Sequence, residues 1–331
     1  MVLPGVDAMT DAEFSLRQVL PERAGMPEVE QLETQTRALR AVDYSSGGGM
    51  CRDAVLVRIH RAHELLGAAA AEPVRSRLFS AVADLHNLAA WTSFDSGHAG
   101  AAHHHLDLAL TLAAHGGNDE LAANIRYRRG RIHLHHGAAD DALAQFQHGR
   151  LAARRSGSSL AASILSANQA WVYAGKGDEQ LALELLGRAA EEFEAAGPAE
   201  PPDWARFFTE TDVAAMTGTV RTELALRGRP RHARTAIAAL TDAVGHYGPN
   251  MARSRSFCLA MLAHAHLLDG ELERGAEIGT EAVDAAETLK SVRTKDRLRP
   301  LKLAAQQRRD HPAVRALAEH ITAFALSSAH V

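Results

Sequence analysis

The sequence predicts an all-α fold made of stacked helical hairpins, on three observations. The first is a period, since Gly97, Gly137 and Gly177 lie 40 residues apart. The second is a frame of small residues that repeats around these glycines, five and twelve residues after each and seven before: Ala102, Ala142, Ala182, Ala109, Gly149, Ala189, Ala90, Gly130 and Ala170. The third is composition, because alanine and leucine dominate and runs of β-branched or aromatic residues are few. A fixed period of this length is typical of repeat proteins, in which small side chains let helices approach closely and glycine ends a helix.

Residues 1–25 contain prolines and glycines around one weakly amphipathic stretch, and we expect them to form a flexible arm. Residues 26–72 contain two predicted helices, one in EVEQLETQTRALRAVDY and one over about 51–71, separated by the glycines of SSGGG. We expect these two helices to cap the N-terminal end of the array.

Residues 73–290 are expected to form five hairpins. The three regular hairpins pair 74–96 with 98–114, 120–136 with 140–155, and 158–174 with 178–196. After the break GPAEPPDW, the fourth pairs 207–227 with 231–247 and the fifth pairs 251–268 with 271–289. Arg221 stands at the position of the fourth hairpin where the others have a small residue, so we expect an extra turn there.

Residues 291–331 are expected to cap the C-terminal end of the array. One helix is predicted over 292–309, kinked or restarted near Pro300, and an amphipathic helix follows over 312–325. A cap is needed because the outermost face of a repeat array must be polar.

Composition excludes several classes of protein. The net charge of −4 provides no general attraction to nucleic acid or to an anionic membrane, and no stretch of 18 uncharged apolar residues predicts a membrane-spanning helix. The N-terminal residues have no basic segment followed by an apolar one, so we predict no signal peptide. Cys51 and Cys258 are far apart in sequence and suit a reducing compartment, and we therefore expect a cytoplasmic protein.

The repeats resemble the tetratricopeptide repeat (TPR), with Phe146 and Tyr173 where that pattern has aromatic residues. Longer strings are similar to the TPR region of actinobacterial regulators of development and antibiotic production: RYRRGRIHLHHGAADDALAQFQHG, SANQAWVYAGKGDEQLALELLGRA, DWARFFTETDVAAMTGTV and MARSRSFCLAMLAHAHLLDG. The resemblance covers about residues 28–325. It implies a right-handed TPR-like superhelix of about five helical hairpins with N- and C-terminal capping helices.

Regulators of this family commonly carry an N-terminal helix-turn-helix domain that binds DNA. The residues that precede the resemblance here are too few for such a domain, so DNA binding is not carried over to this chain. We expect either a stand-alone sensor half or a fragment of a longer regulator.

The resemblance also implies which residues line the concave groove of the superhelix. These candidate ligand-binding residues lie on the first helices of the three regular hairpins: Asp84, Asn87, Trp91, Asp95, Asn124, Tyr127, Arg131, His135, Asn168 and Trp171. Aromatic faces with a few orienting polar groups suit a peptide or a small molecule. The alternative is that Trp91 and Trp171 only pack between neighbouring hairpins.

Histidine is unusually frequent between His86 and His148. His133 and His136 are three residues apart on a predicted helix, but no cysteine or carboxylate completes a set of metal ligands. We therefore expect no metal site and no cofactor. The histidines are expected either to be partly buried between helices or to make the groove sensitive to pH.

A basic run near the C-terminus lacks the aromatic residues that a nucleic-acid site needs. We expect it to be a solvated face that pairs with acidic residues of the preceding helices. The run consists of Lys290, Arg293, Lys295, Arg297, Arg299 and Lys302, and the acidic residues are Glu271, Glu273, Glu281 and Asp284.

No phosphate-binding loop, nucleophile elbow or H-E-x-x-H helix is present in the sequence. The expected function is that of a regulatory or sensor protein whose groove binds a peptide, a small-molecule effector or a partner protein, in control of gene expression or secondary metabolism. The alternatives are a biosynthetic enzyme built on a regulator-derived scaffold and a constitutive protein–protein scaffold. A homodimer is compatible with each of them.

Overall fold

The computed structural model describes residues 23–327, which fold into fourteen α-helices and three short 3-10 helices without a β-strand. The all-α prediction is therefore confirmed for this part of the chain, and the arm predicted for residues 1–25 lies almost wholly outside it. The α-helices in chain order are α2 (Met26–Ser46), α3 (Arg52–Leu66), α4 (Glu72–Asp95), α5 (Ala99–His115), α6 (Asp119–His135), α7 (Ala139–Ser156), α8 (Ser159–Lys176), α9 (Glu179–Ala196), α10 (Glu210–Leu226), α11 (Ala233–His246), α12 (Ala252–Asp269), α13 (Leu272–Glu287), α14 (Val292–Gln306) and α15 (Pro312–Ser327).

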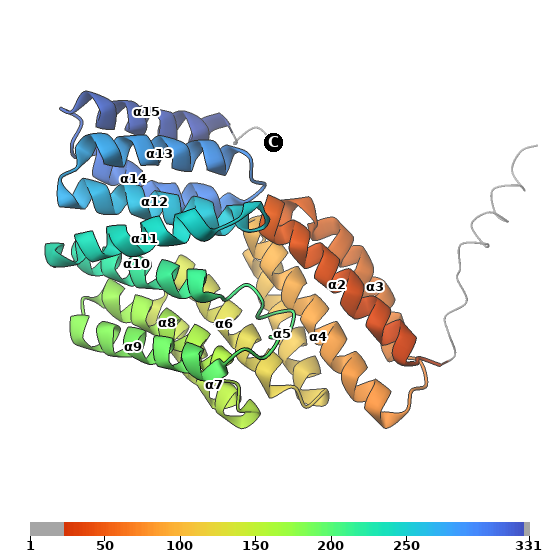
Figure 1. Cartoon of the computed structure of the whole chain (residues 1–331). Coiled ribbons are helices and arrows are strands. Elements are labelled where there is room, and N and C mark those ends of the chain that lie inside the picture. The colour runs from red at the N-terminus through yellow and green to blue at the C-terminus, as the bar shows by residue number, and fades with distance from the viewer. Residues whose placement is uncertain (1–22, 328–331) are drawn as a thin grey trace, which may run out of the picture.

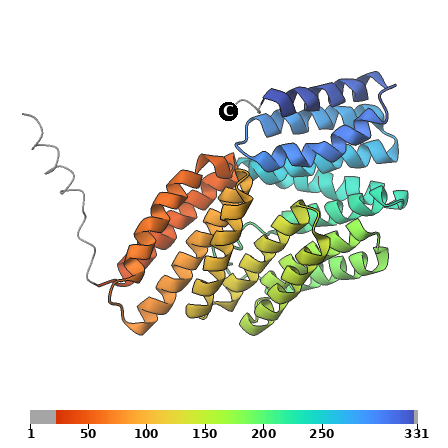
Figure 2. The same ribbon diagram turned by 180° about the vertical axis from the view of Figure 1, so that it is seen from behind.

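Helices that follow one another pack as pairs, and the pairs lie side by side in a curved array (Figure 1). The five pairs from α4–α5 to α12–α13 correspond to the five expected hairpins, with α2 and α3 packed on α4 at one end and α14 and α15 packed on α12 and α13 at the other. The view from behind shows the same order (Figure 2). Helix α14 continues through Pro300 as one helix, so the restart that we expected there is absent.

The glycines of the 40-residue period end the first helix of each regular pair. Gly97, Gly137 and Gly177 follow α4, α6 and α8 and have φ angles of 83°, 78° and 82°. A side chain with a Cβ is strained in this left-handed region, whereas glycine adopts it readily. The 40-residue period therefore marks the turns between the first and the second helix of each regular pair.

The frame of small residues marks where the two helices of a pair touch. A Cβ added at Gly130 of α6 would lie 2.3 Å from the ring of Phe146 on α7. In the fourth pair the equivalent close approach is at Gly218 of α10, where an added Cβ would lie 2.4 Å from Leu240 of α11. We had expected the small residue of this pair at position 221, which is an arginine. The structure shows that it is Gly218, three residues earlier.

The break between α9 and α10 is a segment without regular helix that extends from these helices toward α6 and α2 (Figure 1). Its residues Ala205 and Phe208 are buried. Asn124 Nδ2 of α6 donates to the Trp204 carbonyl at 3.3 Å, and Arg37 Nε of α2 donates to Asp203 at 2.8 Å. The segment therefore joins the N-terminal and central helices over their inner surface (Figure 1).

A buried ion-pair network joins the beginning of the array to its end. Arg253 of α12 donates to both carboxylate oxygens of Asp43 on α2, at 2.7 and 2.8 Å. Asp95 of α4 accepts from Arg253 at 3.2 Å, and from Arg293 Nε and Ser291 Oγ at 2.6 Å each. Burial alone would raise the pKa of Asp95, but Arg293 and Arg253 hold it well below its ordinary value. We call Asp43, Asp95, Arg253 and Arg293 the closing network.

The glycine run after α2 lets the two ends come this close. Gly49 N donates to the Lys290 carbonyl at 3.1 Å, and Lys290 N donates to the Ser46 carbonyl at 3.0 Å. A Cβ at Gly48 would lie 2.8 Å from Asp95, and one at Gly49 would lie 2.9 Å from the Lys290 carbonyl. The SSGGG segment is therefore more than a break between helices, because the backbone at Lys290, just before α14, packs directly against it.

The closing network predicts a large effect of one substitution. Asp95→Ala removes a carboxylate that is fully buried and leaves Arg293 without its ion pair, so we expect the free energy of unfolding to fall by about 3–5 kcal/mol. Urea-induced unfolding measures this loss. Asp140→Ala, which removes the exposed partner of Lys176, is the control and should leave the midpoint nearly unchanged. Similar midpoints for the two variants would contradict a structural role for the network.

The helix contacts predict opposite effects of one substitution at two glycines. Gly130→Ala pushes a methyl group into Phe146 and should destabilise the protein by about 1–3 kcal/mol. Gly175→Ala in α8 meets no atom within 4 Å and should stabilise by up to about 1 kcal/mol through helix propensity. Thermal unfolding of the two variants under the same conditions compares them. Stabilisation by Gly130→Ala would show that the two helices do not need to touch there.

Candidate ligand-binding site

The inner surfaces of the helices surround a cavity of about 140 Å³, which is close in volume to engineered cavities that bind one aromatic ring. We call it the central cavity. Its walls come from α2, from the first helix of every pair between α4 and α14, and from the irregular segment before α10. The lining residues are Tyr44, Trp91, Tyr127, Arg128, Arg131, Asn168, Trp171, Phe207, Phe208, Asp212, Ala215, Met216, Thr219, Tyr247, Met251, Arg253, Ser254, Phe257, Cys258, Met261, Arg293 and Arg297.

One part of the lining consists of aromatic rings and flexible methionine side chains. Tyr127 stacks on Phe207 with 5.7 Å between ring centroids and 15° between planes. Tyr44 packs against the same phenylalanine at 6.5 Å. Three methionines add flexible apolar side chains to the wall: Met216, Met251 and Met261. Such a surface binds flat apolar groups of varied shape.

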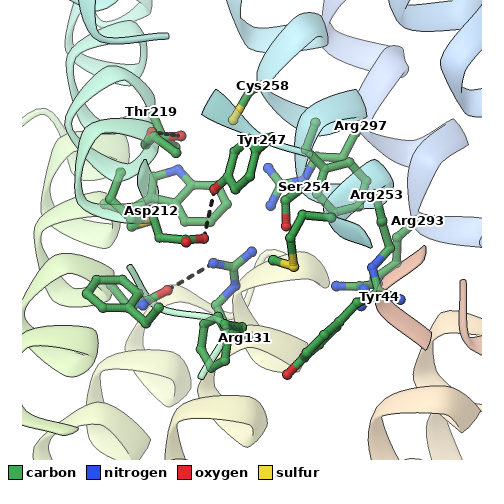
Figure 3. Close-up of a pocket in the computed structure, with 18 of the residues that line it drawn as sticks. Tyr44, Arg131, Asp212, Thr219, Tyr247, Arg253, Ser254, Cys258, Arg293 and Arg297 are labelled. Atoms are coloured by element: carbon green, nitrogen blue, oxygen red, sulfur yellow. Dashed lines mark hydrogen bonds between the residues drawn. The ribbon is translucent and has the colours of Figure 1, made fainter. Parts of the chain in front are cut away.

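The other part of the lining is strongly basic, since five arginines and one acidic residue, Asp212, face the cavity. Figure 3 shows Arg131, Arg253, Arg293 and Arg297 around the same space. Burial lowers the pKa of Arg297 to about 9, and the nearby Arg131 and Arg293 add to this effect. Arg297 is therefore still cationic at neutral pH, at a free-energy cost that a nearby anion would reduce.

The guanidinium groups lie over the two tryptophans of the wall. The guanidinium carbons of Arg131 and Arg297 are each 4.5 Å from the centroid of the Trp171 ring. Arg293 lies 4.3 Å from the centroid of Trp91, and Arg128 lies 5.3 Å from it. Contacts of this kind orient the cations and partly offset their loss of water.

Asp212 is the acidic group of the lining. It accepts hydrogen bonds from Tyr247 Oη at 2.7 Å and from Thr209 Oγ1 at 2.9 Å. It also accepts from the backbone N of Thr209 at 3.2 Å, as part of the capping box that begins α10. Burial raises its pKa to about 6. Its carboxyl group therefore changes charge within the range of ordinary buffers.

Five of the residues expected to bind a ligand line the central cavity: Trp91, Tyr127, Arg131, Asn168 and Trp171. They come from α4, α6 and α8, and Arg131 Nη1 donates to Asn168 Oδ1 at 3.0 Å. The structure therefore brings them to one place.

The other five candidates lie elsewhere. Asp84 pairs with Arg40 at 2.5 Å, and Asp95 belongs to the closing network. Asn87 Nδ2 donates to Asn124 Oδ1 at 3.0 Å, and both residues are buried between α4 and α6. His135 contacts Asp296 at 3.1 Å. It lies in a second cleft that shares Arg131, Trp171, Met261 and Arg297 with the central cavity and is also lined by Glu223 and Asp296. We call this the outer cleft.

Sequence reasoning missed the wall that the C-terminal helices provide. The expectation that the basic run near the C-terminus is a solvated face is wrong for Arg293, which is buried and pairs with Asp95. Arg297 lies one helical turn later and also faces inward. The four-residue spacing of these two arginines was the available signal, because it puts both on one face of a helix.

The expectation that the histidines pack between helices holds for His86, whereas His104, His115 and His148 are exposed. His86 is buried, with His63 Nε2 2.7 Å from its Nε2 and His105 Nδ1 3.0 Å from its Nδ1. Burial and these neighbours lower its pKa to about 3. Within residues 23–327 no group of three or more His, Cys, Asp or Glu side chains is placed to hold a metal ion.

Comparison with protein-family models gives no match, and a search of curated proteins finds no significant similarity. Among the helices that the structure describes, none combines the length and the apolar character needed to cross a bilayer.

The raised pKa of Asp212 predicts a specific dependence of stability on pH. Its pKa is above the ordinary value of 3.8, so its contribution to stability is greatest at low pH and is lost as pH rises through about 6. Relative to Asp212→Asn, which keeps the shape of the side chain and one acceptor oxygen but does not titrate, the wild type should lose up to about 3 kcal/mol between about pH 4 and pH 7.5. Urea unfolding of both proteins across this range measures the difference. A constant difference would show that Asp212 titrates normally.

Proposed function

We propose that this protein is a ligand-binding regulatory protein with a TPR-like superhelical arrangement, and that its ligand is a small molecule held in the central cavity. The observation that carries the proposal is the cavity itself, because α2, α4, α6, α8, α10, α12 and α14 direct aromatic, methionine and basic side chains into one space. A cavity with an apolar wall and a few polar groups is the usual form of a small-molecule site. The closing network favours a small molecule over a long peptide, because it joins the two ends of the array beside the cavity.

The position of the cavity also supports a regulatory role. A ligand there contacts α6 and α8 on one side and α12 and α14 on the other, so it binds residues that are far apart in the sequence. The arrangement of helix pairs that fits the ligand best becomes more populated when the ligand binds. The outer surface of the array changes with it, and a partner protein can respond to that change.

A catalytic function is the second candidate, and Asp212 is the observation that favours it. A carboxyl group with a pKa of about 6 in an aromatic cavity, hydrogen-bonded to Tyr247, has the properties of a general acid or base. Mass spectrometry of a bound compound after incubation separates the two functions. A regulator returns the compound unchanged, whereas an enzyme converts it and loses that conversion in Asp212→Asn.

The proposed function predicts that filling the cavity prevents binding. In a thermal-shift screen of small metabolites that includes neutral, cationic and anionic compounds, we expect at least one compound to stabilise the wild type, by about 2.7 kcal/mol when it is present at 100 times its Kd. Ala215→Leu adds three carbons at the cavity wall and should abolish this stabilisation. Ala195→Leu makes the same change at an exposed position of α9 and should retain it.

Circular dichroism and the melting temperature without compound check that both variants fold. Equal stabilisation of Ala215→Leu and the wild type would place the binding site elsewhere. A screen without any stabilising compound would contradict the proposed function.

A further inference from the structure

The central cavity contains more cationic groups than its acidic neighbours neutralise. Of the five arginines that line it, Arg253 and Arg293 form ion pairs in the closing network. The other three, Arg128, Arg131 and Arg297, have no carboxylate within 4 Å in the part of the chain that the structure describes. Arg128 donates to the Asn87 carbonyl at 2.8 Å, so one of its donors is satisfied by the backbone.

Arg131 and Arg297 are the least neutralised of these groups. Arg131 has one hydrogen bond, to the neutral amide of Asn168, and Arg297 has ring contacts with Trp171 and Phe257. Burial lowers the pKa of both arginines. Both side chains are only partly exposed to solvent, and a cation withdrawn from water without a partner is destabilising unless a counter-ion is provided. The arrangement is therefore unfavourable for the empty protein and favourable for one that binds an anion.

The acidic residues nearby do not serve as this counter-ion. Asp212 accepts from Tyr247 and Thr209, and it forms no ion pair with an arginine of the cavity. Glu223 accepts from Trp171 Nε1 at 3.4 Å and acts on Arg297 only from beyond ion-pair distance. It lines the outer cleft and not the central cavity.

The two arginines are close enough to contact one ligand. Each guanidinium carbon is 4.5 Å from the centroid of the Trp171 ring, so the two carbons are at most 9.0 Å apart. Each guanidinium group presents several N–H donors in a plane, the geometry that matches carboxylate and phosphate oxygens. Both side chains also line the outer cleft, which gives an anion a route to them from outside the protein.

We infer that the ligand of the central cavity is a small oxyanion with a flat apolar body, whose anionic group binds Arg131 and Arg297 while its body packs on the aromatic and methionine side chains. This inference rests on the proposed function and specifies the chemistry of the ligand. The oxyanion is a carboxylate or a phosphate monoester, since both present oxygens to guanidinium groups in the same way. The volume of about 140 Å³ limits the body to about one ring.

The test compares charged and neutral probes of the same shape. Phenylacetate, phenyl phosphate, the neutral phenylacetamide and inorganic phosphate are titrated into the full chain while tryptophan fluorescence and heat are recorded. We expect saturable binding of phenylacetate or phenyl phosphate, at least about tenfold tighter than that of phenylacetamide, because hydrogen bonds to a charged group are worth about 1.5–3 kcal/mol. The stronger of the two anions identifies the oxyanion. Binding of inorganic phosphate alone, with no gain from the ring, would overturn the assignment of the apolar body.

Arg297→Met tests the role of the arginine itself, with Arg315→Met on the exposed surface of α15 as the control. Arg297→Met should weaken binding of the anionic probe at least about tenfold. Because it removes a half-buried cation without an ion-pair partner, it should also melt at or above the wild-type temperature. Arg315→Met should change neither property. A lower melting temperature for Arg297→Met would show that the arginine serves the fold, and equal binding by this variant would also overturn the inference.

The same experiments distinguish a failure of this inference from a failure of the proposed function. If a neutral compound from the metabolite screen binds and Ala215→Leu prevents it, while no anion binds, the cavity is a ligand site and the inference about charge is wrong. If neither anionic nor neutral compounds bind, both proposals are wrong.

Discussion

Two buried aspartates and two buried arginines, which make up the closing network, hold together parts of the chain that are about 200 residues apart. Arg253 reaches Asp43 across 210 residues, and Arg293 reaches Asp95 across 198. All four side chains are almost fully removed from water, so each is tolerated only because the others are present. The two arginines of the network, Arg253 and Arg293, also line the central cavity, so the network stands at the place where α12 and α14 complete the wall.

The local architecture was predictable because its signals are local. Glycines at helix ends and apolar residues at helical spacing predict each helix from a short stretch of sequence. The observed helices agree with those expectations to within a few residues, and many of the glycines have positive φ angles. Gly218 shows the limit of this reasoning. Counting seven residues back from Gly228, as in the regular pairs, places the small residue of the fourth pair at Arg221. The contact with Leu240 shows that the small residue is Gly218, ten residues before that glycine.

Half of the residues that we expected to bind a ligand line the central cavity. Trp91, Tyr127, Arg131, Asn168 and Trp171 follow from their positions on repeated first helices, which all face the same way. Four other lining residues could not be predicted in this way, because they come from the ends of the array and from the irregular segment before α10. These residues are Tyr44, Phe207, Arg293 and Arg297. Neither feature repeats with the period. The same long-range packing explains why the buried Asn87 and Asp95 stabilise the fold and do not line the cavity.

The contact between the glycine run and Lys290 also changes how the array is expected to unfold. In an open repeat protein each unit touches only its neighbours, so the ends can fray independently and stability is approximately a sum of nearest-neighbour terms. Here Arg253 of α12 pairs with Asp43 of α2, and Arg293 of α14 pairs with Asp95 of α4, so helices of the two ends are coupled directly. Loss of either terminal group of helices exposes buried charge in the other, and we therefore expect this chain to unfold more cooperatively than an open array.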